Sequence, residues 1–305
     1  MSINVKELIN QAEAELNNSG VFKRVEETAF YNQKKVLDAF REYRVAESYF
    51  AASSGYGYDD KGRDMLDKIY ARVFEAESAF VRHTLVSGTQ TLAVGLFGLL
   101  RPGDTLLSVT GKPYDTLEEV IGIRGNKGDG SLCDFGVNYK QIEMKDGKVD
   151  LDAVEKELKE NASVKVVFIQ RSKGYSIRET LSPEYIGKVA TLCHKINPNV
   201  FVAVDNCYGE FCDEHEPTYY GADIIMGSLI KNPGGGIAPT GGYIAGRRDL
   251  VEKCANRLTA PGIGKEAGAT LGTSREMYLG VFNAPHAVGE AMKTAMFASK
   301  IFELQ

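Results

Sequence analysis

A lysine stands at the end of an apolar run and directly before a stretch of glycines. Lys231 follows "ADIIMGSLI" (222–230), which is typical of a buried strand, and precedes "NPGGG" (232–236). Burying a lysine costs free energy unless it is paired or chemically modified. The glycines supply no side chains to shield it, and they let the backbone approach a bulky group closely. The lysine therefore either reaches solvent at the strand end or meets a bound cofactor there.

An aspartate ends a second apolar run. Asp205 follows "VFVAV" (200–204), and Tyr208 comes three residues later. A carboxylate at the end of a buried strand costs free energy unless it meets a positive partner, and a protonated pyridine nitrogen would serve. Tyr208 could then hydrogen-bond a phenolic oxygen on the same ring. The alternative is an aspartate that caps the next turn, and the residues alone leave both interpretations open.

A third segment offers a place for a phosphate. "SGTQT" (87–91) lies between an expected strand and an apolar helix. Its candidate residues at the helix N-terminus are Ser87, Gly88, Thr89 and Gln90. Free backbone N–H groups and the helix dipole favour an anion at such a position. An ordinary serine cap followed by a glycine is the simpler explanation of the same residues.

Two further residues complete the set. Ser228 stands three residues before Lys231 and could add a phosphate contact, and Tyr114 follows the apolar run 105–109 and could stack on a flat ring. A single tyrosine is more often a core or surface residue. Together the four segments supply a lysine for a Schiff base, an acidic partner for a pyridinium nitrogen and a phosphate site. Pyridoxal phosphate needs these three things from a protein.

The elements that must position these residues alternate along the chain. Runs typical of strands occur at 79–86, 101–110 (a turn followed by a strand), 138–144, 164–171, 200–206, 222–230 and 241–246. Helices are predicted at 5–16, 25–45, 63–76, 88–100, 114–122, 150–160, 182–196 and 274–305, the last interrupted near Pro285. Short apolar strands between helices indicate an α/β fold with a mostly parallel sheet covered on both faces. Ligands bind at the carboxyl ends of strands in such sheets, where the candidate segments fall.

The bulk composition narrows the class of protein. The 305 residues are 43% hydrophobic, which supports one large domain or a large domain with a smaller one. The 36 basic and 41 acidic residues give a net charge of −5, so no nucleic-acid partner is predicted. The sequence shows neither a signal peptide nor an apolar stretch of membrane-spanning length. We therefore expect a cytoplasmic protein without a membrane partner.

Other site types match the sequence poorly. The five cysteines are odd in number and irregularly spaced, which indicates reduced thiols. Cys207, Cys212 and His215 are close in sequence but match no standard zinc pattern, so no metal is predicted. "GYGYDD" (55–60) lacks the third glycine of a dinucleotide-binding motif, and "TAPGIGKE" (259–266) lacks the first glycine of a P-loop.

The order and spacing of these motifs resemble the fold-type I pyridoxal-phosphate enzymes of cysteine and methionine metabolism. By this resemblance the sequence is identified as a member of the methionine gamma-lyase family often labelled "aluminium resistance protein". The blocks that carry it span 55–64, 86–92, 100–122, 202–211, 227–246 and 259–280. The resemblance implies an aspartate aminotransferase-like large domain at 61–265, after a helical segment at 1–60. It also implies that the helix at 266–305 leads to a small domain that is missing or incomplete here.

The resemblance also implies roles for the residues. Lys231 would attach the cofactor covalently, Asp205 would pair with the ring nitrogen, and Tyr114 would stack on the ring and act as an acid or base. The phosphate would be held by Ser87, Gly88, Thr89, Gln90 and Ser228.

A contact between subunits is also implied, with one departure. In relatives a Tyr-x-Arg motif from a neighbouring subunit reaches the phosphate, and Tyr58 fits its spacing. Asp60 stands where the arginine should be, and Arg63 or Lys61 could substitute. The resemblance implies a homodimer or homotetramer.

The implied activity is elimination from a sulfur amino acid, giving a 2-keto acid, ammonia and a thiol. The sequence does not decide between beta- and gamma-elimination. Aminotransferase, aldolase or racemase chemistry on the same scaffold stays open, because a fold does not fix a function. A truncated chain that binds the cofactor without turnover is the other alternative.

Overall fold

Seven strands form one sheet in the computed structural model, which describes residues 4–305. The order across the sheet is β1-β7-β6-β5-β4-β2-β3. The strands are β1 (Ser78–Arg82), β2 (Thr105–Ser108), β3 (Asn138–Gln141), β4 (Val164–Gln170), β5 (Phe201–Asp205), β6 (Ile224–Ser228) and β7 (Gly242–Gly246). Strands β3, β2, β4, β5 and β6 pair in parallel, whereas β7 runs antiparallel to both β6 and β1. The predicted mostly parallel sheet is confirmed.

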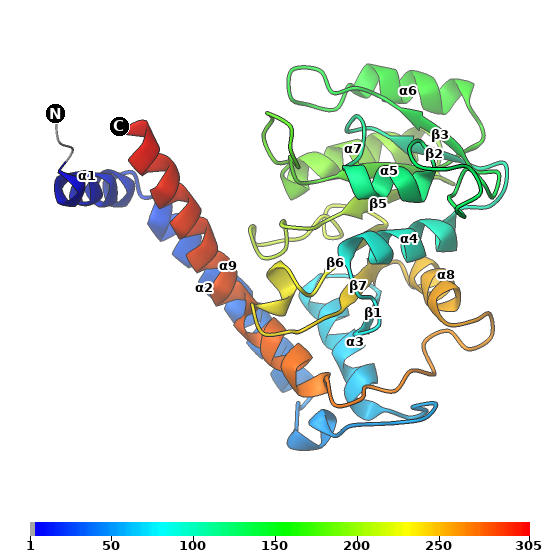
Figure 1. Cartoon of the computed structure of the whole chain (residues 1–305), viewed down its shortest axis with the longest axis horizontal. Helices are drawn as coiled ribbons and strands as arrows, with labels where there is room; N and C mark the ends of the chain where they lie inside the picture. Colours follow the sequence, from blue (N-terminus) through cyan, green and yellow to red (C-terminus); the bar gives the residue numbers. More distant parts are fainter. Residues whose placement is uncertain (1–3) are drawn as a thin grey trace.

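Helices cover both faces of the sheet, and strand residues alternate between the faces. In β5, Val202 and Val204 belong to one buried cluster, whereas Phe201 and Ala203 belong to the other. The first face is covered by α3 (Lys61–Val73), α6 (Leu151–Glu160) and α7 (Pro183–Ile196). The second face is covered by α4 (Gly88–Leu99), α5 (Asp115–Ile121) and α8 (Arg248–Leu258) (Figure 1). This two-sided burial is what wholly apolar strands require.

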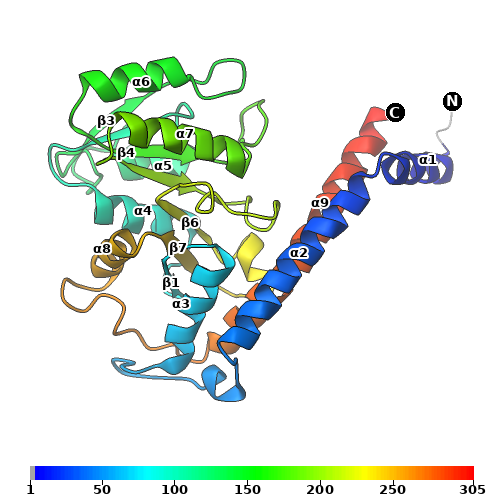
Figure 2. The same cartoon turned by 180° about the vertical axis from the view of Figure 1, so that it is seen from behind.

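A pair of long helices extends beyond this layered body. The helix α2 (Val21–Glu42) lies alongside α9 (Ser274–Glu303) in both views, with α1 (Val5–Asn18) near the far end of the pair (Figures 1 and 2). A short 3₁₀ turn, η1 (Glu47–Phe50), follows α2. The predicted interruption near Pro285 is wrong, because α9 continues through that residue. The buried neighbours Val281, Ala284 and Val288 pack this stretch against the body and offset the one hydrogen bond that a proline removes.

Six of the seven predicted strands end earlier in the structure than predicted, and helix α8 was not predicted. The run 222–230 is a strand only as far as Ser228. Beyond it, Leu229 N donates to Gly241 O at 2.8 Å, and Lys231 N donates to Ser228 O at 3.2 Å, so the chain turns. The run 79–86 ends at Arg82. Helix α8 was missed because no strong start signal precedes it. The predicted division of the chain at residues 60 and 265 stays a prediction.

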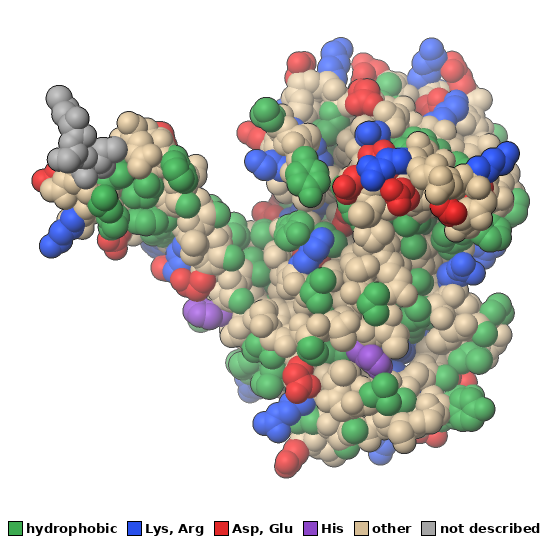
Figure 3. Space-filling view, in the orientation of Figure 1, with side chains coloured by type: hydrophobic (Ala, Val, Ile, Leu, Met, Phe, Trp, Pro, Cys, Tyr) green, Lys and Arg blue, Asp and Glu red, His purple; other side chains and the backbone are tan. Residues whose placement is uncertain are grey.

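The surface carries both signs of charge. On the face drawn in Figure 3, Lys and Arg side chains are interspersed with Asp and Glu side chains. Among the helices of residues 4–305, none combines the length and the apolar composition that crossing a bilayer requires.

Candidate active site

Lys231 lies in the turn after β6 and directly before η2 (Asn232–Gly234), a 3₁₀ turn. Its side chain is half-buried, and Nζ lies 4.2 Å from the centre of the Tyr208 ring. The lysine therefore does not extend freely into solvent. Its ammonium faces an aromatic ring, an arrangement that attracts a cation to the face of the ring.

The glycines after Lys231 serve backbone packing. A Cβ on Gly234 would lie 1.6 Å from Leu229 O, and a Cβ on Gly235 would lie 2.4 Å from Gly280 O on α9. Gly235 also has a φ of +58°, a region that glycine tolerates best. The close approach predicted from the sequence is therefore present, but at these two positions the approaching group is the chain's own backbone.

Asp205 is the last residue of β5, and its side chain is 3% exposed. One carboxylate oxygen accepts a hydrogen bond from Cys207 N at 3.1 Å. No Lys, Arg or His side chain within residues 4–305 forms an ion pair with it. Burial raises the pKa of this carboxyl above its usual value, and the backbone hydrogen bond and Lys231 only partly offset that effect. A buried carboxylate without a cation fits a positively charged ring nitrogen.

The N-terminus of α4 faces this lysine. A Cβ on Gly88 would lie 3.3 Å from Cys207 Sγ, 3.6 Å from Lys231 Nζ and 3.7 Å from Ser228 Cβ. Glycine at the first helical position therefore leaves room beside the lysine. The structure brings Gly88, Lys231, Asp205 and Ser228 to the carboxyl end of β5 and β6, as the sequence predicted.

The side chains around the start of α4 bond within the chain. Ser87 is the N-cap, and its Oγ accepts a hydrogen bond from Gln90 N at 3.1 Å. The side chain of Gln90 turns back to accept a hydrogen bond from Val86 N at 2.7 Å. The simpler explanation of a serine cap is therefore confirmed for Ser87. The backbone N–H groups of Gly88 and Thr89 belong to the first turn, where a helix offers them no internal acceptor.

Tyr114 lies next to the same helix start. It precedes α5, its backbone N donates to Gln170 Oε1 at 3.0 Å, and its hydroxyl shares a hydrogen bond with Thr89 Oγ1 at 3.2 Å. Burial, with a contribution from the charge of Asp205, raises the pKa of Tyr114 to about 12. The phenol therefore keeps its proton at neutral pH and can donate it.

The charges near Lys231 affect its protonation. Burial favours the neutral amine, but Cys207, Tyr208 and Asp205 outweigh burial and hold the pKa of Lys231 above its usual value. The ring of Tyr208 is 60% exposed, and its backbone has a φ of +68°. The side chain predicted to bind the ring oxygen of the cofactor thus lies against the lysine itself.

The two residues predicted for a contact between subunits lie apart from this group. Tyr58 is exposed and stacks on Tyr56, with ring centres 5.6 Å apart. Arg63 is 3% exposed, and its guanidinium donates to backbone oxygens of Gly57, Glu266 and Gly268. The structure assigns Arg63 to holding these loops together.

A nearby aspartate explains the departure from the Tyr-x-Arg pattern. Asp60 caps α3 by accepting from Arg63 N at 2.9 Å, and Ser53 and Thr270 also donate to it. An aspartate at this position therefore has a structural role.

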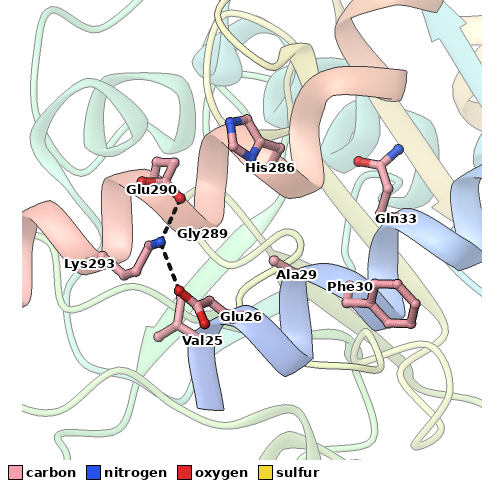
Figure 4. Close-up of a pocket in the computed structure, with 9 residues that line it drawn as sticks. All are labelled: Val25, Glu26, Ala29, Phe30, Gln33, His286, Gly289, Glu290 and Lys293. Carbon is pink, nitrogen blue, oxygen red and sulfur yellow. Dashed lines mark hydrogen bonds and ion pairs between the residues drawn. The ribbon is translucent and has the colours of Figure 1, made fainter. Parts of the chain in front are cut away.

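A hollow away from the lysine lies between α2 and α9 (Figure 4). Its volume is about 290 Å³. The charges that line it pair with one another, since Lys293 contacts Glu290 at 2.7 Å and Glu26 at 3.3 Å. None of the residues proposed for the cofactor lines it.

The cysteines and the histidine near Asp205 bond to separate groups. Cys212 Sγ donates to Tyr208 O at 3.3 Å, whereas His215 Nδ1 lies 2.8 Å from Glu75 Oε1. Within residues 4–305, no cluster of three or more His, Cys, Asp or Glu side chains is placed to hold a metal ion.

Comparison with known proteins decides the family. The methionine gamma-lyase family model matches residues 5–305. The chain belongs to the methionine gamma-lyase family. Pyridoxal 5′-phosphate is the cofactor, and the class of enzyme is a carbon–sulfur lyase.

Relatives resemble the chain along nearly its whole length. It is 49% identical to the uncharacterized protein YnbB of Bacillus subtilis over 292 residues, which cover 95% of the chain and 69% of YnbB. A solved structure of a carbon–sulfur lyase involved in aluminum resistance, from Clostridium novyi, is 52% identical with a TM-score of 0.95. That match covers 98% of the chain and 71% of the Clostridium protein. L-methionine gamma-lyase of Pseudomonas putida is 26% identical over 75% of the chain and 51% of that enzyme.

The residues present fit the family's cofactor. Asp205 is buried and forms no ion pair within residues 4–305, and Gly88 leaves space where a Cβ would approach Lys231 Nζ. The uncapped N–H groups of α4 supply the polarity that a phosphate requires. Sequence analysis found these residues but missed the buried ion network beneath them, whose members lie far apart in the chain.

Proposed function

We propose that the enzyme cleaves a sulfur amino acid by methionine gamma-lyase-like elimination, releasing a 2-keto acid, ammonia and a thiol. The observation that carries the proposal is the convergence of Lys231, Asp205 and the start of α4 at one edge of the sheet. The description of the matching family and the name of the Pseudomonas putida relative support methionine as the substrate.

The same residues hold the cofactor in this proposal. Lys231 attaches it covalently, and the carboxylate of Asp205 pairs with the ring nitrogen. The N–H groups of Gly88 and Thr89, which lie in the first turn of α4 and have no acceptor within the helix, would hold the phosphate. The phosphate position is flanked by three further side chains. Ser87 and Gln90 fix the start of α4, and Ser228 lies beside Gly88.

The reaction is assigned to residues as follows. When bound, pyridoxal phosphate supplies an electron sink for the substrate's α-carbon. The amine of Lys231 takes the Cα proton, and Asp205 keeps a negative charge opposite the ring nitrogen. Gamma-elimination also removes a Cβ proton before the Cγ–S bond breaks. The phenol of Tyr114 holds its proton at neutral pH and donates it to the departing sulfur.

We propose that the enzyme acts as a homodimer or homotetramer. Tyr56 and Tyr58 are exposed on the loop before α3, on a segment free to contact a second copy. Light scattering on the purified chain measures the assembly directly. A monomer that retains full turnover would contradict the proposal.

A spectrum followed by a substrate assay tests the function. The holoenzyme is expected to show a visible band that borohydride bleaches, with phosphopyridoxyl found on the peptide that contains Lys231. Lys231→Ala is expected to lose this covalent attachment. Holoenzyme incubated with L-methionine is expected to release 2-oxobutyrate, ammonia and methanethiol.

The products discriminate between the alternatives. Pyruvate from a cysteine-type thioether would indicate beta-elimination, and an amino group transferred to a keto acid would indicate an aminotransferase. Covalently bound cofactor with none of these products from any sulfur amino acid would refute the lyase assignment for this chain.

A further inference from the structure

The loop that follows β5 has a backbone that needs support. Residues 206–216 place Cys207 and Tyr208 beside Lys231. Two non-glycine residues of this loop have positive φ values, Tyr208 at +68° and Phe211 at +63°. Such conformations cost free energy for residues that carry a Cβ, so they persist only where surrounding contacts impose them.

A buried ion pair supports this loop. Arg171 and Glu216 are each 1% exposed, and Arg171 Nη1 lies 3.2 Å from Glu216 Oε2. Asn206 joins both side chains, since its Oδ1 accepts from Arg171 Nη1 at 2.8 Å and its Nδ2 donates to Glu216 Oε2 at 2.9 Å. Arg171 directly follows β4 and Asn206 directly follows Asp205. The pair therefore ties together the ends of two neighbouring strands.

Glu216 also binds the middle of the loop. Its second oxygen, Oε1, accepts from Phe211 N at 3.0 Å, at one of the two strained residues. Three donors thus converge on this one carboxylate, one from the end of β4 and two from the loop itself. An extra Cβ on Gly209 would lie 2.3 Å from Arg171 Nη1, so the loop's backbone lies directly on the guanidinium.

The fastened loop reaches the residue next to the lysine. Asn232, which follows Lys231, donates from Nδ2 to Glu210 O at 3.0 Å. The loop therefore makes two contacts with the turn that contains Lys231. It bonds to Asn232, and it places the ring of Tyr208 against the Lys231 ammonium.

We propose that Glu216 is a positioning residue of the cofactor site. By binding Arg171, Asn206 and Phe211 N, it fixes the loop that sets Asp205 and Tyr208 against Lys231. Glu216 acts through these groups without touching the cofactor. The inference rests on the proposed roles of Lys231 and Asp205.

Glu216→Gln tests this role with little change in volume. Glutamine has one acceptor oxygen and one NH₂ group, so it cannot accept at both ends. At least one of the three donors would then face another donor. Arg171 also loses its deeply buried anionic partner and keeps only the more exposed carboxylate of Asp213.

Asp223→Asn is the matched control. Asp223 is a buried carboxylate at the opposite end of β5 and β6, where it accepts from Val202 N at 2.7 Å and contacts His194 and Arg247. Its substitution loosens the same two strands far from Lys231. The two variants are prepared as holoenzymes and compared with wild type by three measurements. These are the thermal midpoint, the dissociation constant for pyridoxal phosphate and the circular dichroism of the visible cofactor band.

Both variants are expected to lose thermal stability, but only Glu216→Gln is expected to change the cofactor site. Its dissociation constant should rise on the order of tenfold, as for other residues that orient binding groups indirectly. Its visible circular dichroism should weaken. Glu216→Asp keeps the charge with a shorter reach, so it should fall between wild type and Glu216→Gln. It also replaces Glu216→Gln in the comparison if that variant does not fold.

Two results would overturn the inference in different ways. If the Glu216 variants keep wild-type affinity and dichroism, or change no more than Asp223→Asn, Glu216 serves stability alone while the site assignment stands. If wild type itself shows no lysine-linked cofactor band, the proposed roles of Lys231 and Asp205 fall, and this inference falls with them.

Discussion

Asp205 shows how one buried charge can define a binding partner. Its carboxylate is almost fully enclosed and forms no ion pair within residues 4–305, and Lys231 only partly offsets the cost of burial, so the anion is poorly stabilised. A protonated pyridine nitrogen would reverse that balance, and the carboxylate would in turn keep the nitrogen protonated. The residue and the cofactor would each stabilise the charge of the other.

Asp205→Asn is expected to separate binding from chemistry. The amide keeps the shape but cannot hold a proton on the ring nitrogen by its charge. We expect pyridoxal phosphate to remain bound and turnover to fall by roughly 10²-fold or more, as when one electrostatic partner of a transition state is removed. Absorbance and steady-state kinetics measure the two effects. Unchanged turnover would show that Asp205 is not the ring partner.

The raised pKa of Lys231 predicts how cofactor attachment depends on pH. Only the neutral amine attacks an aldehyde, and the pKa of Lys231 lies above its usual value. Below that pKa the neutral fraction grows about tenfold per pH unit. The rate at which apoprotein takes up pyridoxal phosphate should therefore rise steadily from pH 7 to 9. Nα-acetyl-lysine in solution is the reference, and its rate should level off at lower pH than the protein's.

Tyr114→Phe is expected to reduce turnover while leaving the cofactor in place. The substitution keeps the ring and removes the hydroxyl, whose pKa of about 12 preserves its proton at neutral pH. Loss of a general acid lowers kcat by about 10²- to 10⁴-fold. Cofactor affinity, followed by absorbance, should change little. A variant with normal kcat would assign protonation of the sulfur to another group.

At the scale of elements, the start of α4 combines a stability role with a binding role. Ser87 caps the helix, and the next residue, Gly88, lies beside Lys231. A cap fixes where the helix begins, and therefore where its free N–H groups point.

Ser87→Ala is expected to lower both stability and cofactor affinity. Loss of a serine cap costs about 1 kcal/mol of unfolding free energy. Ser182 caps α7 in the same manner, accepting from Tyr185 N at 3.2 Å, so Ser182→Ala is the matched control. Both variants should lose similar stability in thermal unfolding, whereas only Ser87→Ala should bind pyridoxal phosphate more weakly. Equal affinity of the two variants for pyridoxal phosphate would show that the Ser87 cap does not contribute to phosphate binding.

The sequence predicted the elements and their chemistry better than their contacts. Apolar strands and capped helices follow local rules, so the sheet, α4 and Lys231 could be located from residues near one another. The strand before Lys231 ends at Ser228 because the chain turns there, with Lys231 N donating to Ser228 O, although the apolar residues that follow Ser228 indicate a longer strand. Arg171 and Glu216 are likewise 45 positions apart, and their meeting depends on the order of strands in the sheet.

At the scale of the whole molecule, the α2–α9 pair depends on close packing more than on charge. The ion pair between the two helices, Lys293 with Glu26 at 3.3 Å, has an exposed carboxylate and contributes little. The two helices approach closely at Gly289, where a Cβ would lie 3.1 Å from Ala29 Cβ.

Gly289→Val is therefore expected to destabilise the pair. The added side chain has to displace Ala29, at a cost of about 1 to 3 kcal/mol. Glu26→Gln, which removes the ion pair with Lys293 between the same two helices, should change the unfolding free energy by less than about 1 kcal/mol. Denaturant unfolding measures both. A larger loss of stability from Glu26→Gln than from Gly289→Val would show that charge contributes more than packing.

The reversed strand β7 has a consequence for how the enzyme is made. β1 pairs with β7 alone, and the partners Ser78 and Gly246 are 168 positions apart (246 − 78). A ribosome adds roughly 5 to 20 residues per second, so β1 waits roughly 10 to 30 seconds for its neighbour to be synthesised. Throughout that interval an apolar strand has an unsatisfied edge. The nascent chain is therefore most exposed to mispairing before β7 leaves the ribosome, and chaperones that shield extended apolar segments would act on it then.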